Sequence, residues 1–186
     1  RGKCGNSDQT WYGQGVFPWE RRADGVNKLA NFKPECDWET LRAEMKEHGV
    51  RNATLMAIAP VESSSVVINS TNGIEMPMSL ISVKESKAGS LTQVVPDYHI
   101  KRVRNSYQLM WEQKNCDAYL KTASVLAAYV DQSISTNTFY NPAHFPEQKV
   151  PTTLIAKNLM QAHSWGLKTF YYSLINKAGV KRHEVE

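Results

Sequence analysis

The sequence predicts an α/β fold, because a helical segment leads into a strand-forming segment twice along the chain. Residues 37–48 carry apolar side chains at spacings of three and four, which indicates a helix, and Gly49 is a suitable stop. The apolar run 54–59 that follows is typical of a strand buried on both faces. The same order returns at 151–165 and 167–172, and helices that alternate with strands are typical of α/β proteins.

The middle of the chain predicts a small α+β region. Alternating segments at 79–84 and 90–95 indicate a β-hairpin. Helices are expected at 105–113 and 117–133, the second because an apolar stripe runs along it. The two prolines in 135–149 indicate an ordered loop.

The two ends of the chain lack a clear period. The N-terminal part predicts an irregular connection with one helical turn near 21–27, and its aromatic residues are expected to pack on a neighbouring surface. The C-terminal residues are charged and expected to fray. We therefore divide the chain into an irregular segment, a first helix–strand segment, a small lobe, a second helix–strand segment and a tail, at residues 1–36, 37–78, 79–145, 146–178 and 179–186.

Composition argues against several classes of protein. The 186 residues suffice for one domain with a core, or for a piece of something larger, as the initial Arg1 suggests. The net charge of +4 comes without a dense basic run, so we expect no nucleic-acid partner. No apolar run approaches the roughly 18 to 20 residues of a membrane span, and no signal peptide opens the chain.

The cysteines and histidines predict neither disulfides nor metal. Cys4, Cys36 and Cys116 are widely separated and odd in number, which argues against a disulfide framework or a zinc site. The histidines lack the spacing of paired ligands. We expect no metal in this chain and a reducing, cytoplasmic location.

The segment Pro60–Ser65, PVESSS, is the first candidate site. It follows the predicted strand and precedes a short helix expected at 65–72, which Asn72-Gly73 would close. Unpaired N–H groups, the helix dipole and serine hydroxyls together favour an anion such as phosphate. The alternative is a serine-rich helix cap that faces only solvent.

Seven sequence blocks carry a resemblance to a known family. They are RNATL (51–55), PVESSS (60–65), NGIEMP (72–77), QVVPDY (93–98), DQSISTNTFYNPAHFP (131–146), KVP (149–151) and KTFYY (168–172). Over roughly residues 37 to 178 the chain resembles the carboxy-terminal part of the large, catalytic subunit of class I ribonucleotide reductase. The resemblance implies a ten-stranded α/β barrel, to which this chain gives the last two strands with the small lobe between them.

The resemblance also implies a role for the serine-rich segment. In that family the segment holds the phosphate groups of the ribonucleoside diphosphate substrate through backbone N–H and hydroxyl groups. The residues that correspond here are Pro60, Val61, Glu62, Ser63, Ser64 and Ser65. The family often has serine where this chain has Val61, so a backbone donor remains there and a side-chain contact does not.

Tyr171 and Tyr172 are the second candidate site. Adjacent side chains of a strand point to opposite faces, so two stacked tyrosines require a bulge or bend. Without the resemblance, one core ring and one surface ring is the ordinary interpretation. The resemblance implies a radical relay by coupled proton and electron transfer, in which Tyr171 faces the small subunit and Tyr172 faces a reactive cysteine.

The implied partners follow from the same resemblance. They are the amino-terminal part of the large subunit, the small (beta) radical-generating subunit with its metal centre, and a thioredoxin- or glutaredoxin-type reductant; no cofactor is expected in this chain. The small subunit is expected to dock near helix 151–165, although packing alone explains the apolar face of that helix. None of the three cysteines has the context of the family's reactive thiols, so a non-catalytic scaffold that binds a nucleotide or a partner is the alternative.

Overall fold

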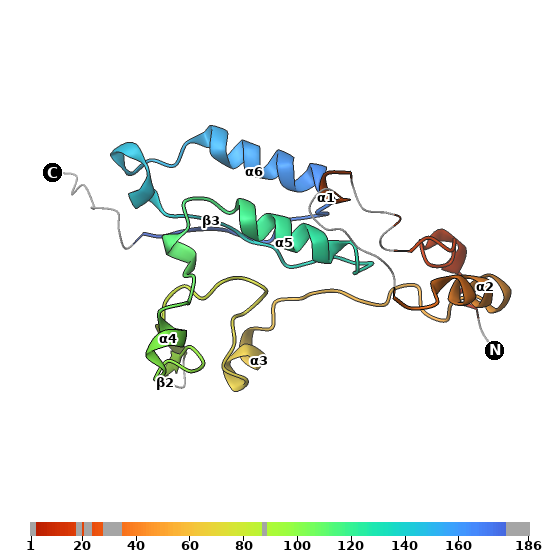
Figure 1. Ribbon diagram of the computed structural model, residues 1–186, viewed down its shortest axis with the longest axis horizontal. Coiled ribbons are helices and arrows are strands. Elements are labelled where there is room, and N and C mark those ends of the chain that lie inside the picture. The colour runs from red at the N-terminus through yellow and green to blue at the C-terminus, as the bar shows by residue number, and fades with distance from the viewer. Residues whose placement is uncertain (1–2, 18–19, 21–23, 28–34, 87–88, 178–186) are drawn as a thin grey trace. The chain divides into compact units, whose positions relative to one another are not determined.

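The computed structural model describes residues 3–17, 20, 24–27, 35–86 and 89–177 (Figure 1). The chain divides into two compact units. The first comprises residues 1–58, 120–134 and 160–169, and the second comprises 59–119, 135–159 and 170–186. Helices α5 (Asp117–Ala127) and α6 (Thr152–Ser164) contribute residues to both units.

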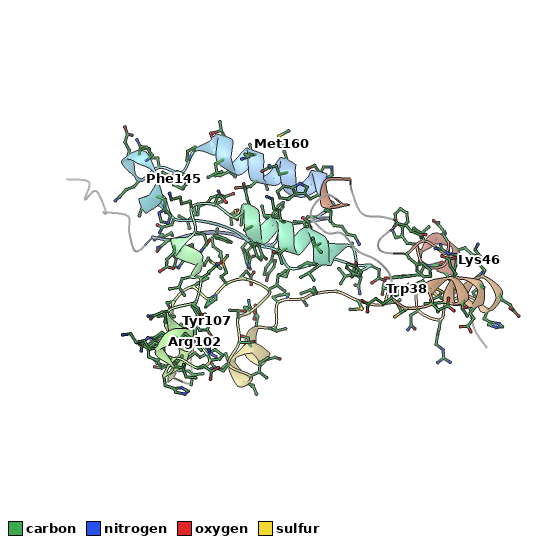
Figure 2. All side chains as sticks on the ribbon, viewed as in Figure 1. Trp38, Lys46, Arg102, Tyr107, Phe145 and Met160 are labelled. Atoms are coloured by element: carbon green, nitrogen blue, oxygen red, sulfur yellow. The ribbon has the colours of Figure 1, made fainter. Side chains whose placement is uncertain are left out.

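The first unit contains a helix whose ends follow local sequence signals. Besides η1 (Ser7–Gln9) and α1 (Asp24–Asn27), it holds α2 (Trp38–His48), along which Figure 2 labels Trp38 and Lys46. Asp37 caps α2, since its carboxylate accepts from the Thr40 N–H at 3.1 Å. Gly49 ends the helix with a φ of 75°. The helix predicted for 37–48 is confirmed.

Aromatic packing joins the N-terminal part to α2. Phe17 is fully buried, and its ring centroid lies 5.2 Å from that of Trp38. The Arg42 guanidinium lies over the Phe17 ring and forms an ion pair with Glu20 at 2.6 Å. The aromatic residues of the N-terminal part therefore include one true core residue, whereas the predicted contact of Trp19 lies outside the described residues.

The strand predicted at 54–59 is wrong as a strand buried on both faces. Only Ile58 forms a β-bridge, parallel with Ile134, and Leu55 and Met56 are about half exposed. The Asp131 carboxylate accepts from the N–H groups of Leu55 and Met56 at 2.7 Å each, where a second strand would otherwise pair. An apolar run becomes a buried strand only with neighbours on both sides, and the described residues supply one.

The second unit contains a hairpin and several short helices. Strands β1 (Ile81–Ser86) and β2 (Gly89–Val94) pair antiparallel, with Ile81 opposite Val94, which confirms the predicted hairpin. Helix α4 spans Lys101–Arg104 and η3 spans Met110–Glu112, so the helix predicted at 105–113 is wrong. The Met110 N–H donates to the Pro77 carbonyl, which withdraws it from a continuous helical ladder.

A second pair of strands was not predicted in this form. Strands β3 (Thr138–Tyr140) and β4 (Ser173–Ile175) pair in parallel, with Thr138 opposite Ser173. β3 lies inside the expected loop 135–149, which also holds η4 (Pro142–His144) and η5 (Pro146–Gln148). The strand predicted at 167–172 is wrong in its bounds, because the regular ladder begins only after the tyrosines.

The two longest helices of the C-terminal half differ in how well their faces were predicted. In α5 the buried stripe is confirmed at Tyr119, Leu120 and Ala123. The helix ends at Ala127 rather than at residue 133, because the backbone near 132–134 pairs with residues 56–58. In α6, whose apolar face was expected to pack, Ala162 is fully buried but Leu159 is 43% exposed, and the polar Asn158 is fully buried.

Figure 2 shows Met160 projecting outward from α6, in accord with its high exposure. No helix in the described ranges combines the length and apolarity that crossing a membrane requires.

Candidate functional site

The serine-rich segment supplies the first turn of a short helix. Helix α3 spans Glu62–Val67, so it begins three residues before the predicted start at Ser65. Its first residue, Glu62, has a φ of 30°, in the left-handed region that non-glycine residues seldom adopt. Val61 and Glu62 are exposed, as are the side chains of Ser63 and Ser64. The candidate residues therefore present a polar, open face.

Asn72 explains the early helix start. Its side-chain oxygen accepts from the Glu62 N–H, and its backbone carbonyl accepts from the Val61 N–H at 2.8 Å. Asn72 thus caps the helix from ten positions further along the chain, rather than ending it as predicted. The helix instead ends near Ile68, and Asn69 follows with a φ of 52°.

The three serines have different environments. Ser65 is fully buried, and its hydroxyl donates to the Glu62 carbonyl. Within the described part of the chain, the hydroxyls of Ser63 and Ser64 have no hydrogen-bond acceptor or donor, and the Ser63 N–H has no acceptor. Ser63 and Ser64 therefore offer hydrogen bonds to a ligand, whereas Ser65 stabilises the turn.

The tyrosine pair stacks through a local departure from strand geometry, as predicted. The ring centroids of Tyr171 and Tyr172 lie 4.1 Å apart with a tilt of 49°. The Tyr171 N–H donates to the Thr136 carbonyl at 2.8 Å, and the Tyr172 carbonyl accepts from the Thr138 N–H at 2.9 Å. In a regular parallel ladder a single residue would make both bonds. Two residues make them here, which is the geometry of a bulge.

Electrostatics link the tyrosine pair to the serine turn. The hydrogen-bonded phenol of Tyr172 raises the pKa of Tyr171, and the Glu62 carboxylate raises that pKa further. A nearby carboxylate disfavours a second negative charge, which is why Glu62 raises the pKa of Tyr171. Both tyrosines are exposed, Tyr171 at 45% and Tyr172 at 56%.

Two residues that sequence reasoning missed join these parts. Asn137 accepts from the Tyr172 N–H at 3.0 Å, and its amide N–H donates to the Glu75 carboxylate. Glu75 and Asn72 belong to the block 72–77, and Asn137 belongs to 131–146. Both blocks carried the family resemblance, which is the one signal that could have pointed to these residues.

A buried polar cluster lies elsewhere in the second unit. Asn158 is fully buried; it donates to the Asp117 carboxylate at 2.7 Å and accepts from the Tyr140 hydroxyl at 3.3 Å and the Cys116 thiol at 3.5 Å. Burial raises the pKa of the Cys116 thiol and raises the pKa of Tyr140 to about 12. Every polar group of the cluster has a partner, which indicates a structural role.

The three cysteines have different environments. All are free thiols: Cys36 is exposed, Cys4 is half-buried and Cys116 is buried against Asn158. Among the residues that the structure describes, no three His, Cys, Asp or Glu side chains gather as metal ligands would.

Comparisons with known proteins agree on one family. A family model described as ribonucleotide reductase, barrel domain, matches residues 1–173. The chain is 43% identical over its whole length to the ribonucleoside-diphosphate reductase subunit alpha of Buchnera aphidicola subsp. Baizongia pistaciae, covering 24% of that protein. It is 42% identical over 172 residues, 92% of the chain, to subunit alpha of the Salmonella typhimurium ribonucleoside-diphosphate reductase 1, covering 22% of it.

A relative from a virus matches almost the whole chain as well. The ribonucleoside-diphosphate reductase subunit alpha of Enterobacteria phage T4 is 39% identical over 183 residues, which is 97% of this chain and 24% of the phage protein. The chain therefore spans about a quarter of the length of the curated relatives it matches.

Proposed function

Since this chain belongs to the family of ribonucleotide reductase barrel domains, we propose that it is part of the catalytic alpha subunit of a ribonucleoside-diphosphate reductase. In that role it supplies the turn that binds the substrate phosphates and the tyrosine pair that relays the radical. The observation that carries the proposal is the set of contacts that connects the turn to the pair: Asn72 accepts from the Glu62 N–H, and Asn137 contacts both Glu75 and the Tyr172 N–H. The proposed phosphate-binding turn and the proposed tyrosine relay are thereby connected.

The substrate is a ribonucleoside diphosphate held mainly by Ser63 and Ser64. Their exposed hydroxyls and the Ser63 N–H donate to phosphate oxygens, and such charge-assisted hydrogen bonds are strong. Pro60 and Val61 shape the approach to the helix, and Ser65 holds its first turn together. The Glu62 carboxylate acts on Tyr171 through its charge. It does not contact the phosphates, because two anions repel each other.

The radical passes through Tyr172 and then Tyr171, which is the opposite of the order that the resemblance implies, because Tyr172 is the more exposed ring. Each phenol gives up one electron and its proton when it is oxidised, and regains both when the next group is oxidised in turn. The exposed Tyr172 receives the oxidising equivalent from the small subunit, and Tyr171 passes it to a cysteine of the amino-terminal part. The supporting observation is the distance of 4.1 Å between the two ring centroids.

The remaining parts of the enzyme come from partners. The amino-terminal part of the large subunit supplies the reactive thiols, the small subunit supplies the radical-generating metal centre, and a thioredoxin- or glutaredoxin-type protein supplies reducing equivalents. Together with the amino-terminal part, this chain forms a ten-stranded barrel that carries residues 79–145 as a small lobe, and the small subunit docks near α6. The free thiols of the chain suit a reducing cytoplasm.

Replacement of Tyr172 by phenylalanine tests the proposal in the complete alpha subunit assembled with its small subunit. The phenol O–H is lost while the ring stays, so we expect nucleotide reduction to stop and ribonucleoside diphosphate binding to persist. Tyr98→Phe is the matched control, because its ring contact with Arg104 survives the change. Unchanged turnover in Tyr172→Phe contradicts the relay and favours a scaffold that binds without catalysis.

A further inference from the structure

The bulge at the tyrosine pair leaves one N–H group without a backbone acceptor, and a side chain accepts from it instead. The Tyr171 N–H and the Tyr172 carbonyl both bond to residues 136–138, so the Tyr172 N–H is left without a backbone partner. Asn137 fills that gap, because its side-chain oxygen accepts from the Tyr172 N–H at 3.0 Å. Asn137 is buried, so water is a poor substitute for this contact. The geometry that stacks the two rings therefore depends on the Asn137 side chain.

Only an amide fits both contacts of this position. Asn137 accepts from Tyr172 with its oxygen and donates to Glu75 with its nitrogen. An aspartate at 137 keeps the acceptor, but it loses the donor and places a second carboxylate against Glu75. An alanine loses both contacts. The contact with Glu75 therefore orients the Asn137 amide so that its oxygen faces the Tyr172 N–H.

Glu75 belongs to the segment that caps the serine turn. Three residues earlier in the chain, Asn72 accepts from the N–H groups of Val61 and Glu62. Gly73 lies between them, and a side chain there would meet the Glu75 carboxylate at 2.5 Å. One short stretch, residues 72–75, therefore contacts the start of α3 at one end and Asn137 at the other.

We propose that Glu75 and Asn137 are positioning residues that hold Tyr172 stacked on Tyr171 and tie this stack to the substrate turn through residues 72–75. The inference rests on the proposed function, since it assigns the contact network a purpose in radical transfer. Glu75 and Asn137 touch neither the substrate nor the reacting atoms; they act through the backbone of Tyr172.

A swap of the polar pair tests this in the complete alpha subunit with its small subunit. Asn137→Asp sets two carboxylates face to face, and we expect kcat to fall by about tenfold or more with KM little changed, because ångström-scale misplacement of reacting groups is costly. Glu75→Gln keeps an acceptor for Asn137 and should retain activity. The double variant Glu75→Gln/Asn137→Asp restores a donor–acceptor pair with the roles exchanged, and its kcat should return close to that of Glu75→Gln.

Amide hydrogen exchange gives a readout independent of activity. In Asn137→Ala the Tyr172 N–H loses its acceptor, so the peptide that carries Tyr172 should exchange faster than in the unaltered protein. Asn105→Ala is the matched control, because it removes the same side chain at an exposed position. Its kcat and exchange should stay unchanged.

The outcomes separate this inference from the proposed function. Wild-type kcat in Asn137→Asp, or a double variant as slow as Asn137→Asp, overturns the positioning role while the reductase assignment stands. Unchanged exchange at Tyr172 in Asn137→Ala overturns the contact itself. An unaltered assembled enzyme that reduces no ribonucleotide overturns the proposed function, and the exchange measurement still decides whether Asn137 holds Tyr172.

Discussion

Three consecutive serines of the turn have different environments. Ser63 and Ser64 expose hydroxyls without protein partners in the described residues, whereas Ser65 is fully buried and bonded to the Glu62 carbonyl. The same side chain is thus open to a ligand at two positions and stabilises the fold at the third. The difference arises because successive residues of a helix lie about 100° apart around its axis, so the three cannot share one environment.

Alanine substitutions at these positions should separate substrate affinity from stability. In the complete alpha subunit, Ser63→Ala and Ser64→Ala each remove a charge-assisted hydrogen bond of about 1.5 to 3 kcal/mol, so KM for the diphosphate should rise about tenfold or more. Ser65→Ala should instead lower the free energy of unfolding by about 1 kcal/mol. Steady-state kinetics and denaturant unfolding of the same three variants measure both effects. An increase in KM for Ser65→Ala alone would contradict the assignment.

The buried Tyr140 phenol gives the protein a pH dependence with a definite sign. Desolvation, and then the nearby Cys116 charge, raise its pKa from 10.0 to about 12 in the folded state. The unfolded state therefore loses this proton first as the pH rises, and binds fewer protons between the two values. The contribution of Tyr140 to stability is complete below pH 10.0 and is lost progressively towards pH 12.

Comparison with Tyr140→Phe isolates that dependence. The variant lacks the titrating group, so its stability relative to the unaltered protein should improve as the pH rises from 10.0 towards 12. Loss of the hydrogen bond to Asn158 adds an offset that is the same at every pH below this range. Denaturant unfolding at several pH values measures the difference. A difference that stays constant across the range would contradict a raised pKa at Tyr140.

At the scale of elements, the end of α2 depends on a residue without a side chain. Gly49 combines a φ of 75° with a ψ of −178°, a region that is essentially restricted to glycine. A Cβ at this position would also meet Lys3 Cγ at 2.6 Å. We expect Gly49→Ala to lower the free energy of unfolding by about 1 to 3 kcal/mol. Gly5→Ala, where the added atom meets nothing within 4 Å, is the control in the same unfolding assay.

Elements with local signals were predictable from the sequence, and those made by distant partners were not. Asp37 and Gly49 mark the two ends of α2 and lie next to the helix in the sequence. The alternation of apolar and polar residues in 79–84 and 90–95 indicated the hairpin. The start of α3 depends on Asn72, and β3 pairs with a strand 35 residues further along, as Thr138 with Ser173 shows. Neither the cap by Asn72 nor the pairing of β3 with β4 produces a periodic pattern in the sequence. The tyrosine stack required a bulge on stereochemical grounds, but nothing in the sequence pattern named Asn137 as its support.

At the scale of the whole molecule, the chain should be inactive without its partners. The only thiols in the sequence are Cys4, Cys36 and Cys116, and the one inside the second unit's core is bonded to Asn158 rather than directed at the tyrosines. Purified by itself, the chain should therefore form no deoxyribonucleotide. Addition of the amino-terminal part and the small subunit should restore the reaction, measured as deoxyribonucleotide produced per enzyme. Activity of the isolated chain would contradict a site shared with a partner.

The most direct test is a crystal structure of the complete alpha subunit with a ribonucleoside diphosphate bound. The account predicts that the phosphate oxygens accept from the hydroxyls of Ser63 and Ser64, and that the ribose lies on the side of the turn where Tyr171 is found. A diphosphate bound away from Ser63 and Ser64, or a ribose separated from Tyr171 by the body of the domain, would contradict it.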